Sequence, residues 1–146
     1  MERDSKGTIL LVDDQLELRS IHSAYLQKHG YEVLTASDGE SALRCVRERR
    51  PDIVFLDHSL RGQTGLEVAR ELKRDPETAN IPIFMLTGHS YGAVGRRALD
   101  IGCAGYLSKP VSPQRVLYEV ERILGEEHGG VGRNGAVDGA TSAAGD

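Results

Sequence analysis

Polar side chains that could bind a cation or a phosphoryl group follow four apolar runs of this 146-residue chain. Asp13 and Asp14 follow the first run and Asp57 follows the second, while Thr87 and Lys109 come after the other two. Three carboxylates within a few ångströms repel one another, which raises their pKa values unless a cation intervenes. Mg²⁺ suits such a group, since it binds one or two carboxylates and then holds a phosphoryl oxygen. An aspartate beside Mg²⁺ can act as a nucleophile that forms an aspartyl-phosphate, and a lysine and a threonine add donors for its oxygens.

Five strands are predicted from the apolar runs. Continuous apolar runs of four to six residues are typical of strands buried on both faces, as in a parallel sheet. Pro82 stands near the start of its run, where a missing hydrogen-bond donor is tolerated. A fifth run, Glu32–Ala36, is less apolar and predicts an edge strand. The four continuous runs are Thr8–Val12, Ile53–Leu56, Ile81–Leu86 and Cys103–Leu107.

Helices are predicted between the strands, where apolar residues recur every three or four positions. A weaker helix is predicted at about 92–101, where Gly92 and Gly95 each lower helix stability by ~1 kcal/mol. The periodic residues of the other four helices are Leu18, Ile21, Tyr25 and Leu26; Ala42, Leu43 and Val46; Leu66, Ala69 and Leu72; and Val116, Val120, Ile123 and Leu124.

Helix ends are marked by capping residues. Gly30 is a candidate C-cap of the first helix, and Asp38 is a candidate N-cap of the second, which Pro51 ends. Ser112 is predicted to cap the last helix, with Pro113 in its first turn. Strand and helix therefore alternate five times, which predicts an α/β fold with a doubly wound parallel sheet and right-handed crossovers.

Ligands of doubly wound sheets bind at the carboxyl ends of the strands. A pair of aspartates at a strand end is more often a turn or a helix cap than a ligand pair. Here, however, the three acids, the threonine and the lysine all fall at the same end of successive strands. That coincidence favours one joint site.

Composition excludes several classes of protein. Eighteen basic and 22 acidic residues give a net charge of −4, which disfavours a nucleic-acid binder. No run of 18 apolar residues and no secretory signal is found, so a cytoplasmic protein without membrane contact is predicted. Cys45 and Cys103 are predicted to be reduced thiols. His22 and His29 are predicted to be ordinary helix residues, and the arginines at 44, 47, 49 and 50 to form a solvated face.

Three segments are predicted along the chain. Residues 1–7 are an N-terminal extension, residues 8–124 form the folded domain, and residues 125–146 form a flexible tail or linker. The last segment contains seven glycines and almost no large apolar side chains, so it cannot bury enough surface to order itself.

Four segments carry a resemblance to a known family. They are Ile9–Asp14, Pro51–Asp57, Met85–Gly88 and Gly102–Pro110. In this order and at these spacings, the chain from about Thr8 to Leu124 resembles a response-regulator receiver domain of two-component phosphorelay signalling, in the CheY-like superfamily. The resemblance implies a flavodoxin-like five-stranded parallel sheet in the order 2-1-3-4-5, with five helices.

The resemblance also implies a phosphoacceptor and a metal site. Asp57 would accept a phosphoryl group from the histidine of a sensor kinase or of a histidine phosphotransferase. Asp14, Asp57 and the backbone carbonyl of Ser59 would coordinate Mg²⁺, with Asp13 helping directly or through water. Such a protein catalyses only its own phosphorylation and dephosphorylation, so it is a regulator rather than an enzyme acting on other substrates.

A conformational switch is implied in the same way. Thr87 and Lys109 would grip the phosphoryl oxygens, and Tyr106 would turn inward as Thr87 moves. The face formed by the fourth helix, the fifth strand and the fifth helix would be the output surface for an unidentified downstream protein, and could also carry a homodimer. One departure is Arg61, which follows Leu60 where many members have proline.

Three alternatives stay open from the sequence. The chain could be a receiver fragment of a larger regulator or of a hybrid kinase. A Mg²⁺-dependent phosphatase of the haloacid-dehalogenase type also uses Asp, Thr and Lys, but it has an Asp-x-Asp pair after the first strand and a cap domain. A flavodoxin-like electron carrier would need a phosphate loop where Asp13 and Asp14 would repel the flavin phosphate.

Overall fold

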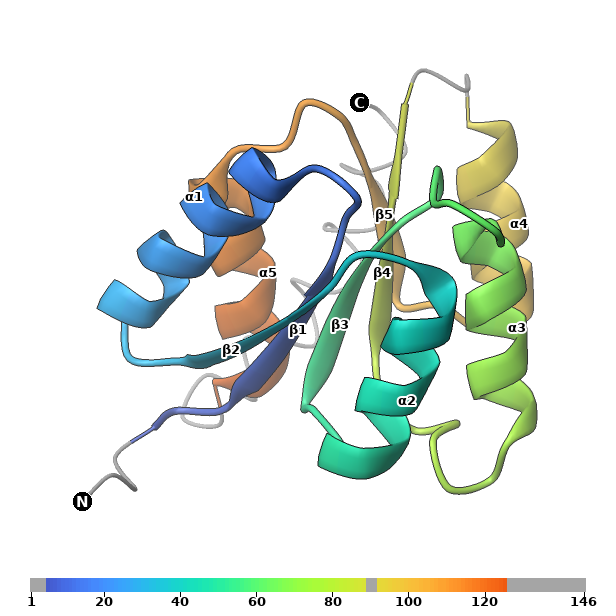
Figure 1. Cartoon of the computed structure of the whole chain (residues 1–146), viewed down its shortest axis with the longest axis horizontal. Coiled ribbons are helices and arrows are strands. Elements are labelled where there is room, and N and C mark those ends of the chain that lie inside the picture. The colour runs from blue at the N-terminus through green and yellow to red at the C-terminus, as the bar shows by residue number, and fades with distance from the viewer. Residues whose placement is uncertain (1–4, 89–91, 126–146) are drawn as a thin grey trace.

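The computed structural model describes residues 5–88 and 92–125. Its parallel strands lie in the order β2-β1-β3-β4-β5, with α1 and α5 on one face and α2, α3 and α4 on the other (Figure 1). The predicted flavodoxin-like α/β fold is therefore confirmed. In chain order the elements are β1 (Thr8–Val12), α1 (Leu16–Lys28), β2 (Glu32–Ala36), α2 (Gly39–Arg49), β3 (Ile53–Asp57), α3 (Gly65–Arg74), β4 (Ile83–Thr87), α4 (Ala93–Ile101), β5 (Gly105–Ser108) and α5 (Pro113–Leu124).

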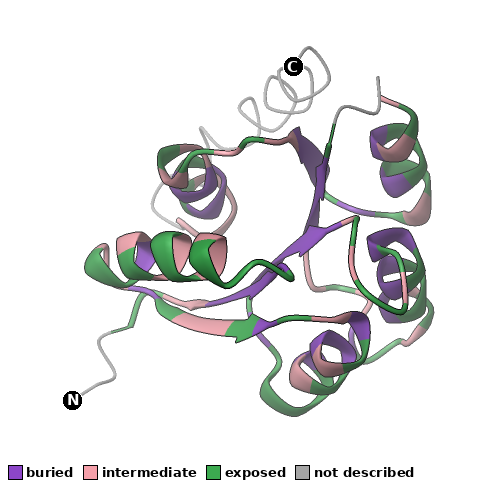
Figure 2. Ribbon diagram, turned by 45° about the horizontal axis from the view of Figure 1, so that its top comes forward, coloured by how far each residue is buried: buried purple, intermediate pink, exposed green. Residues whose placement is uncertain are grey.

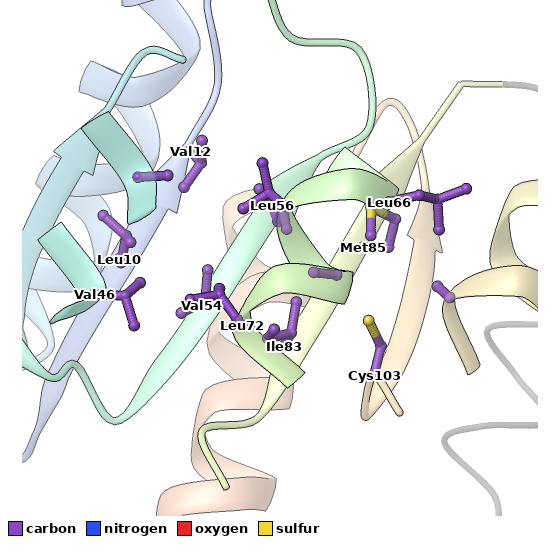
Figure 3. Close-up of a cluster of buried hydrophobic side chains, with 14 of the residues drawn as sticks. Leu10, Val12, Val46, Val54, Leu56, Leu66, Leu72, Ile83, Met85 and Cys103 are labelled. Atoms are coloured by element: carbon purple, nitrogen blue, oxygen red, sulfur yellow. The ribbon is translucent and has the colours of Figure 1, made fainter. Parts of the chain in front are cut away.

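Apolar side chains fill both faces of the sheet. Every residue of β3 and β4 is buried, as expected for central strands of a parallel sheet covered on both sides. Toward α2, α3 and α4, Leu10, Val54 and Met85 belong to one core cluster (Figure 3). Toward α1 and α5, the rings of Phe55 and Phe84 stack with centroids 5.4 Å apart. Two packed faces hold the strands rigidly and so fix where their carboxyl ends lie.

The predicted N-caps form, whereas the C-cap of α1 is His29 rather than Gly30, which follows it with a left-handed φ of 99°. The Asp38 carboxylate accepts the Ser41 N–H at 2.8 Å, and the hydrogen bonds from the backbone and side chain of Ser41 lower the pKa of Asp38. The Ser112 hydroxyl accepts the Arg115 N–H at 3.0 Å, with Pro113 at the start of α5. Local sequence therefore sets the beginnings of α2 and α5.

The fourth helix differs from the prediction in its glycines. Gly92 is the N-cap, with a left-handed φ of 88°, and the helix begins at Ala93. Gly92 therefore does not weaken the helix interior, and the prediction was wrong on this point. Gly95 does lie inside α4, where a Cβ would collide with the ring of Tyr106. The glycine thus allows close packing of α4 against β5.

Two strands begin later than predicted. β4 begins at Ile83 rather than Ile81; Pro82 cannot donate to the ladder, although its carbonyl accepts the Val54 N–H at 3.0 Å. β5 begins at Gly105 rather than Cys103. Both cysteines are free thiols, as predicted, and burial raises the pKa of Cys103 to about 11.

The first helix buries less apolar surface than its sequence suggests. Leu26 is its buried residue, whereas Leu16 and Ile21 are 66% and 56% exposed. The prediction that Ile21 belongs to the packed face was wrong, and Figure 2 shows α1 exposed or half-buried along nearly its whole length. Within the described ranges, no helix combines the length and apolar composition needed to cross a bilayer.

Candidate functional site

Three carboxylates meet at the carboxyl end of the sheet. One oxygen each of Asp13, Asp14 and Asp57 lies within 4.8 Å of the other two. Because the parallel ladder pairs Val12 with Leu56, the next residues, Asp13 and Asp57, lie side by side. Asp57 and Asp13 are buried, at 2% and 7% exposure, while Asp14 is exposed. The carboxylates predicted to act together are thus neighbours in space.

Asp57 lies at the centre of this group and has two partners. The Lys109 ammonium donates to its Oδ2 at 2.8 Å, and the Ser59 N–H donates to its Oδ1 at 3.0 Å. Lys109 is placed by its own backbone N–H, which donates to the Thr87 carbonyl at 2.7 Å and extends the β4–β5 ladder. One ammonium therefore faces three carboxylates.

Asp13 is tied to three segments. Its N–H donates to the Ala36 carbonyl at 3.1 Å, its Oδ1 accepts the Gln15 N–H at 2.9 Å, and its carbonyl accepts Nη1 of Arg19 at 2.6 Å. Burial is the main cause that raises the pKa of Asp13, and the charges of Asp57 and Asp14 add to it. The hydrogen bond from Gln15 and the charge of Lys109 oppose this shift. The net rise shows that burial, assisted by the neighbouring carboxylates, outweighs the Gln15 hydrogen bond and the charge of Lys109.

Thr87 and Tyr106 occupy the neighbouring strand ends. Thr87 is buried, and its hydroxyl donates to the Gly88 carbonyl at 3.2 Å. A Cβ on Gly88 would meet nothing within 4 Å, so there is open space beside the residue that follows Thr87. Tyr106 is buried at 7% exposure against Gly95 of α4. The ring therefore lies inward in this structure, between β5 and α4.

Comparison with known proteins accounts for this arrangement. Residues 9–121 match the family model of the response regulator receiver domain. The chain belongs to this family. It is 38% identical over 117 residues to the phosphate regulon transcriptional regulatory protein PhoB of Pseudomonas aeruginosa, covering 80% of this chain but 51% of PhoB. The chain thus spans about half the length of that relative.

Two shorter receivers match over nearly their whole length. The polar-differentiation response regulator DivK of Brucella anthropi is 31% identical over 121 residues, covering 83% of this chain and 98% of DivK. The chemotaxis response regulator CheY4 of Vibrio cholerae superposes with a TM-score of 0.74 at 32% identity, covering 80% of this chain and 98% of CheY4. The chain is a receiver domain of the kind found in two-component response regulators.

The donor set of this receiver domain fits a hard divalent cation. Mg²⁺ prefers oxygen ligands, and clustered carboxylates provide them. Burial, with smaller contributions from the charges of Asp57 and Asp14, raises the pKa of Asp13, and a cation at this position would favour its ionised form. Ser59, the other expected ligand, is exposed two residues after Asp57. Its N–H already contacts Asp57.

Gly65 and Arg19 are two neighbours of the receiver site that sequence reasoning did not select. A Cβ on Gly65 would lie 2.5 Å from the Asp57 carbonyl and 2.8 Å from Cα of His58, so α3 begins directly against the end of β3. The capping box between Thr64 and Glu67 marks that helix start and could have been found in the sequence. The close approach of Gly65 depends on how α3 packs against β3. The contact from Arg19 to Asp13 spans only six residues, but no sequence pattern signals it.

Proposed function

We propose that this receiver domain takes up a phosphoryl group on Asp57 from a phosphohistidine of a sensor kinase or of a histidine phosphotransferase. The observation that carries the proposal is a buried Asp57 carboxylate 2.8 Å from an ammonium and beside two further carboxylates. A carboxylate oxygen of Asp57 attacks phosphorus and forms a P–O bond. The P–N bond to histidine breaks, and its electron pair stays on the ring nitrogen. Phosphotransfer to its own aspartate is then the chemistry that the domain catalyses.

We propose that Asp14, Asp57 and the Ser59 carbonyl hold Mg²⁺, with Asp13 contributing directly or through water. When bound, the ion supplies positive charge that offsets the carboxylate repulsion and the charge on the phosphoryl oxygens. The raised pKa of Asp13 supports this assignment, because a buried carboxylate among like charges gains from a cation.

Lys109 and Thr87 would hold the phosphorylated state. Transfer adds nearly two negative charges and three acceptor oxygens at Asp57. Lys109 already contacts the Asp57 carboxylate, and the Thr87 hydroxyl, bonded to a neighbouring carbonyl, is free to reorient toward a phosphoryl oxygen. Tyr106 packs directly against α4, so we propose it as the element that links the site to that helix.

The output surface would be the face of α4, β5 and α5. Leu99 and Tyr118 are large hydrophobic residues on these helices that remain 40% and 50% exposed. Arg96 and Arg97 are exposed on the same helix as Leu99, and the Arg115 guanidinium lies 5.8 Å from the ring centroid of Tyr118. Exposed apolar side chains next to charges are typical of protein contact surfaces. We propose that a downstream protein or a second receiver binds here, which light scattering with and without beryllofluoride would test.

We propose that the receiver unit spans residues 8–124. The described helix α5 ends at Leu124, in agreement with this boundary. The proposed N-terminal extension at 1–7 and tail or linker at 125–146 fall largely on residues 1–4 and 126–146, which lie outside the described residues.

The test is intact mass spectrometry after incubation with Mg²⁺ and acetyl phosphate. We expect a gain of one phosphoryl group, lost in Asp57→Asn and in the presence of a chelator. Asp100→Asn, on the exposed face of α4, is the matched control and should label like the wild type. If the domain does not take phosphate from acetyl phosphate, its binding of beryllofluoride, followed by NMR, tests the same site. An unchanged spectrum with that ligand, together with no mass gain, would contradict the proposal.

A further inference from the structure

His22 in α1 forms a contact between this helix and the segment that joins β5 to α5. Its Nε2 lies 3.0 Å from the carbonyl oxygen of Val111, and its Nδ1 lies 3.0 Å from the carbonyl oxygen of Leu18, one turn earlier in the helix. Helices α1 and α5 cover the same face of the sheet (Figure 1). Because Val111 is 89 residues from His22 in the chain, the contact fixes two remote segments relative to each other.

The segment held in this way carries Lys109. The backbone N–H of Lys109 donates to the Thr87 carbonyl at 2.7 Å, and its ammonium lies 2.8 Å from the Asp57 carboxylate. Two residues later, the described part of the chain offers the backbone of Val111 one hydrogen-bond partner, the ring of His22. The lysine of the acidic site is therefore followed directly by an attachment to α1.

The two acceptors require two donors on the ring. A backbone carbonyl accepts hydrogen bonds and cannot donate one, and a neutral imidazole has a single N–H. The neutral ring can therefore bond to one carbonyl while the lone pair of its other nitrogen faces the second oxygen. Only an imidazolium of His22 satisfies both contacts. His29 of the same helix makes the same contact with the carbonyl four residues earlier, that of Tyr25, at 3.0 Å. Its other nitrogen has no hydrogen-bond partner among the described residues, so a neutral ring suffices there.

The charges that face His22 both favour and oppose an imidazolium. A pocket of about 330 Å³ lies beneath α1, and His22 lines it together with Asp13 after β1, Arg19 one turn earlier in α1, and Lys109 after β5. Strands β1, β3 and β4 and helix α5 add apolar side chains to its walls. Asp13 attracts a cationic ring, whereas Arg19 and Lys109 repel it, and Lys109 is itself paired with Asp57. Because attraction and repulsion offset each other, the two carbonyl oxygens decide which form of the ring is favoured.

We propose that His22 is a positioning residue for Lys109 and that it acts as an imidazolium, which ties the segment after β5 to α1 through the Val111 carbonyl. Loss of the second proton removes one of the two donors, so the attachment weakens as the pH rises. The role in phosphotransfer rests on the proposed function, because Lys109 acts there on Asp57. The bridge itself does not, since it consists of contacts within the unphosphorylated chain.

The bridge is tested by NMR of the histidine ring nitrogens on the full, unphosphorylated chain without Mg²⁺, from about pH 5 to 9, which spans the titration of histidine. His22→Gln and His29→Gln assign the two signals. We expect His22 to hold its second proton about three- to tenfold more tightly than His29, the gain from one hydrogen bond to a charged donor less the repulsion from Arg19 and Lys109. In urea the two rings should become equivalent. If His22 loses its second proton as easily as His29, or more easily, the imidazolium bridge is refuted.

The positioning role is tested by the rate of labelling with acetyl phosphate and Mg²⁺, followed by intact mass spectrometry. His22→Leu has no donor, and we expect labelling about tenfold slower, because small displacements of a group at the reacting centre are costly. His22→Gln keeps a donor at the position of Nε2 and should label like the wild type in mild acid. Its amide does not titrate, so above neutral pH the wild type should label about threefold more slowly than this variant, the cost of one hydrogen bond. His29→Gln is the control on the same helix and should label like the wild type.

The two measurements fail separately. The positioning role is refuted if His22→Leu is labelled at the wild-type rate, or if the ratio of the wild-type rate to that of His22→Gln does not change with pH. The NMR result for the bridge stands in that case. If the wild type is not labelled and beryllofluoride leaves its spectrum unchanged, the proposed function is refuted, and the titration of the His22 ring still decides the bridge.

Discussion

Two half-buried lysines stand at opposite ends of the sheet with different partners. At the amino end, Lys73 donates to the carbonyls of Ala79 and Ile81, both at 2.8 Å, and burial lowers its pKa. At the carboxyl end, Lys109 donates to the Asp57 carboxylate at 2.8 Å, with two more carboxylates beside it. Lys73 donates only to uncharged backbone carbonyls in a loop. Lys109, in contrast, neutralises only part of the charge of the acidic cluster.

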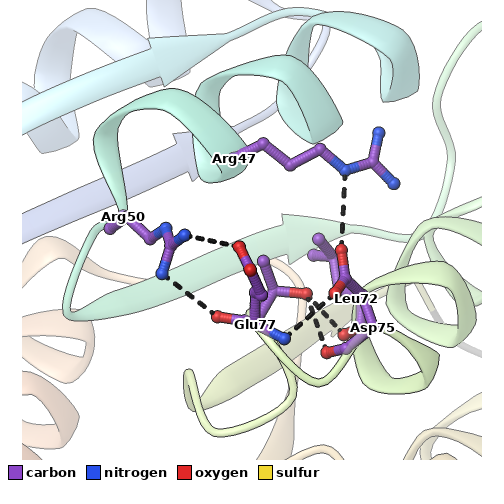
Figure 4. A network of polar contacts seen from close by, with 6 residues as sticks. Arg47, Arg50, Leu72, Asp75 and Glu77 are labelled. Carbon is purple, nitrogen blue, oxygen red and sulfur yellow. Dashed lines mark hydrogen bonds and ion pairs between the residues drawn. The ribbon is translucent and has the colours of Figure 1, made fainter.

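Other charges at the amino end are also paired. Arg50 lies 2.7 Å from the Glu77 carboxylate, and Arg47 lies 4.0 Å from Asp75 (Figure 4). The basic residues predicted to form a solvated face do lie at the surface. Three of them pair with carboxylates, Arg47 with Asp75, Arg49 with Glu32 and Arg50 with Glu77. The difference shows that unbalanced charge is concentrated where a ligand is proposed to bind. Unbalanced charge lowers stability locally, and such groups are more typical of functional sites than of structural ones.

The largest expected effect is that of Lys109→Ala. It leaves a buried carboxylate beside two others, so we expect the free energy of unfolding without Mg²⁺ to fall by about 2–3 kcal/mol, less than for a fully buried pair. Urea unfolding measures it, and Mg²⁺ should restore most of the loss. Asp57 should still take up phosphate poorly, while NMR signals of the α4–β5–α5 face stay unchanged. Normal signalling by this variant would show that the assigned role is wrong.

Lys73→Met tests the other end. Two carbonyls lose their donor, so we expect the free energy of unfolding to fall by about 1–2 kcal/mol. Because no carboxylate is left unpaired, Mg²⁺ should give this variant no more stabilisation than the wild type. Lys28→Met, at the exposed end of α1, is the control and should change little. If Mg²⁺ restored the stability of Lys73→Met, the two ends of the sheet would not differ in charge balance as described.

Asp13→Asn should stabilise the protein without Mg²⁺ at neutral pH. Burial, assisted by Asp57 and Asp14, raises the pKa of Asp13 in the folded state, so ionising this carboxyl costs folding free energy above that pKa. The cost disappears below the unfolded value of about 3.9. The gain in urea midpoint should therefore shrink as the pH falls from 7 toward 4. Asp100→Asn is the control, and a destabilised Asp13→Asn at pH 7 would contradict the electrostatic account.

Glu77→Gln should have the smallest effect. It removes an exposed partner of Arg50, and such pairs contribute about 0.2–1 kcal/mol. Thermal unfolding in low salt should detect a small loss that vanishes near 1 M salt, where the screening length is about 3 Å. Glu71→Gln, exposed on α3, provides the baseline. If the loss of stability persisted in high salt, packing rather than charge would account for the contribution of Glu77.

Much of the fold could be predicted because local rules act on short segments. Central strands appear as continuous apolar runs, since they are buried on both faces. The hydroxyl of Ser112 and the carboxylate of Asp38 cap helices by bonding to residues three positions away. The apolar face of α1 was predicted wrongly at Ile21, because its spacing fits a buried stripe equally well whether or not the sheet lies close enough to cover it.

The sequence by itself determined which residues end the strands, and in a parallel sheet that places Asp13, Asp57, Thr87 and Lys109 at one edge. Only the tertiary structure decided the charge balance among them, because pairing and burial depend on distances between segments remote in the chain. It also decided that Gly95 makes room for Tyr106. The pocket beneath α1 has the same origin, since its walls come from three strands and two helices that no local pattern relates.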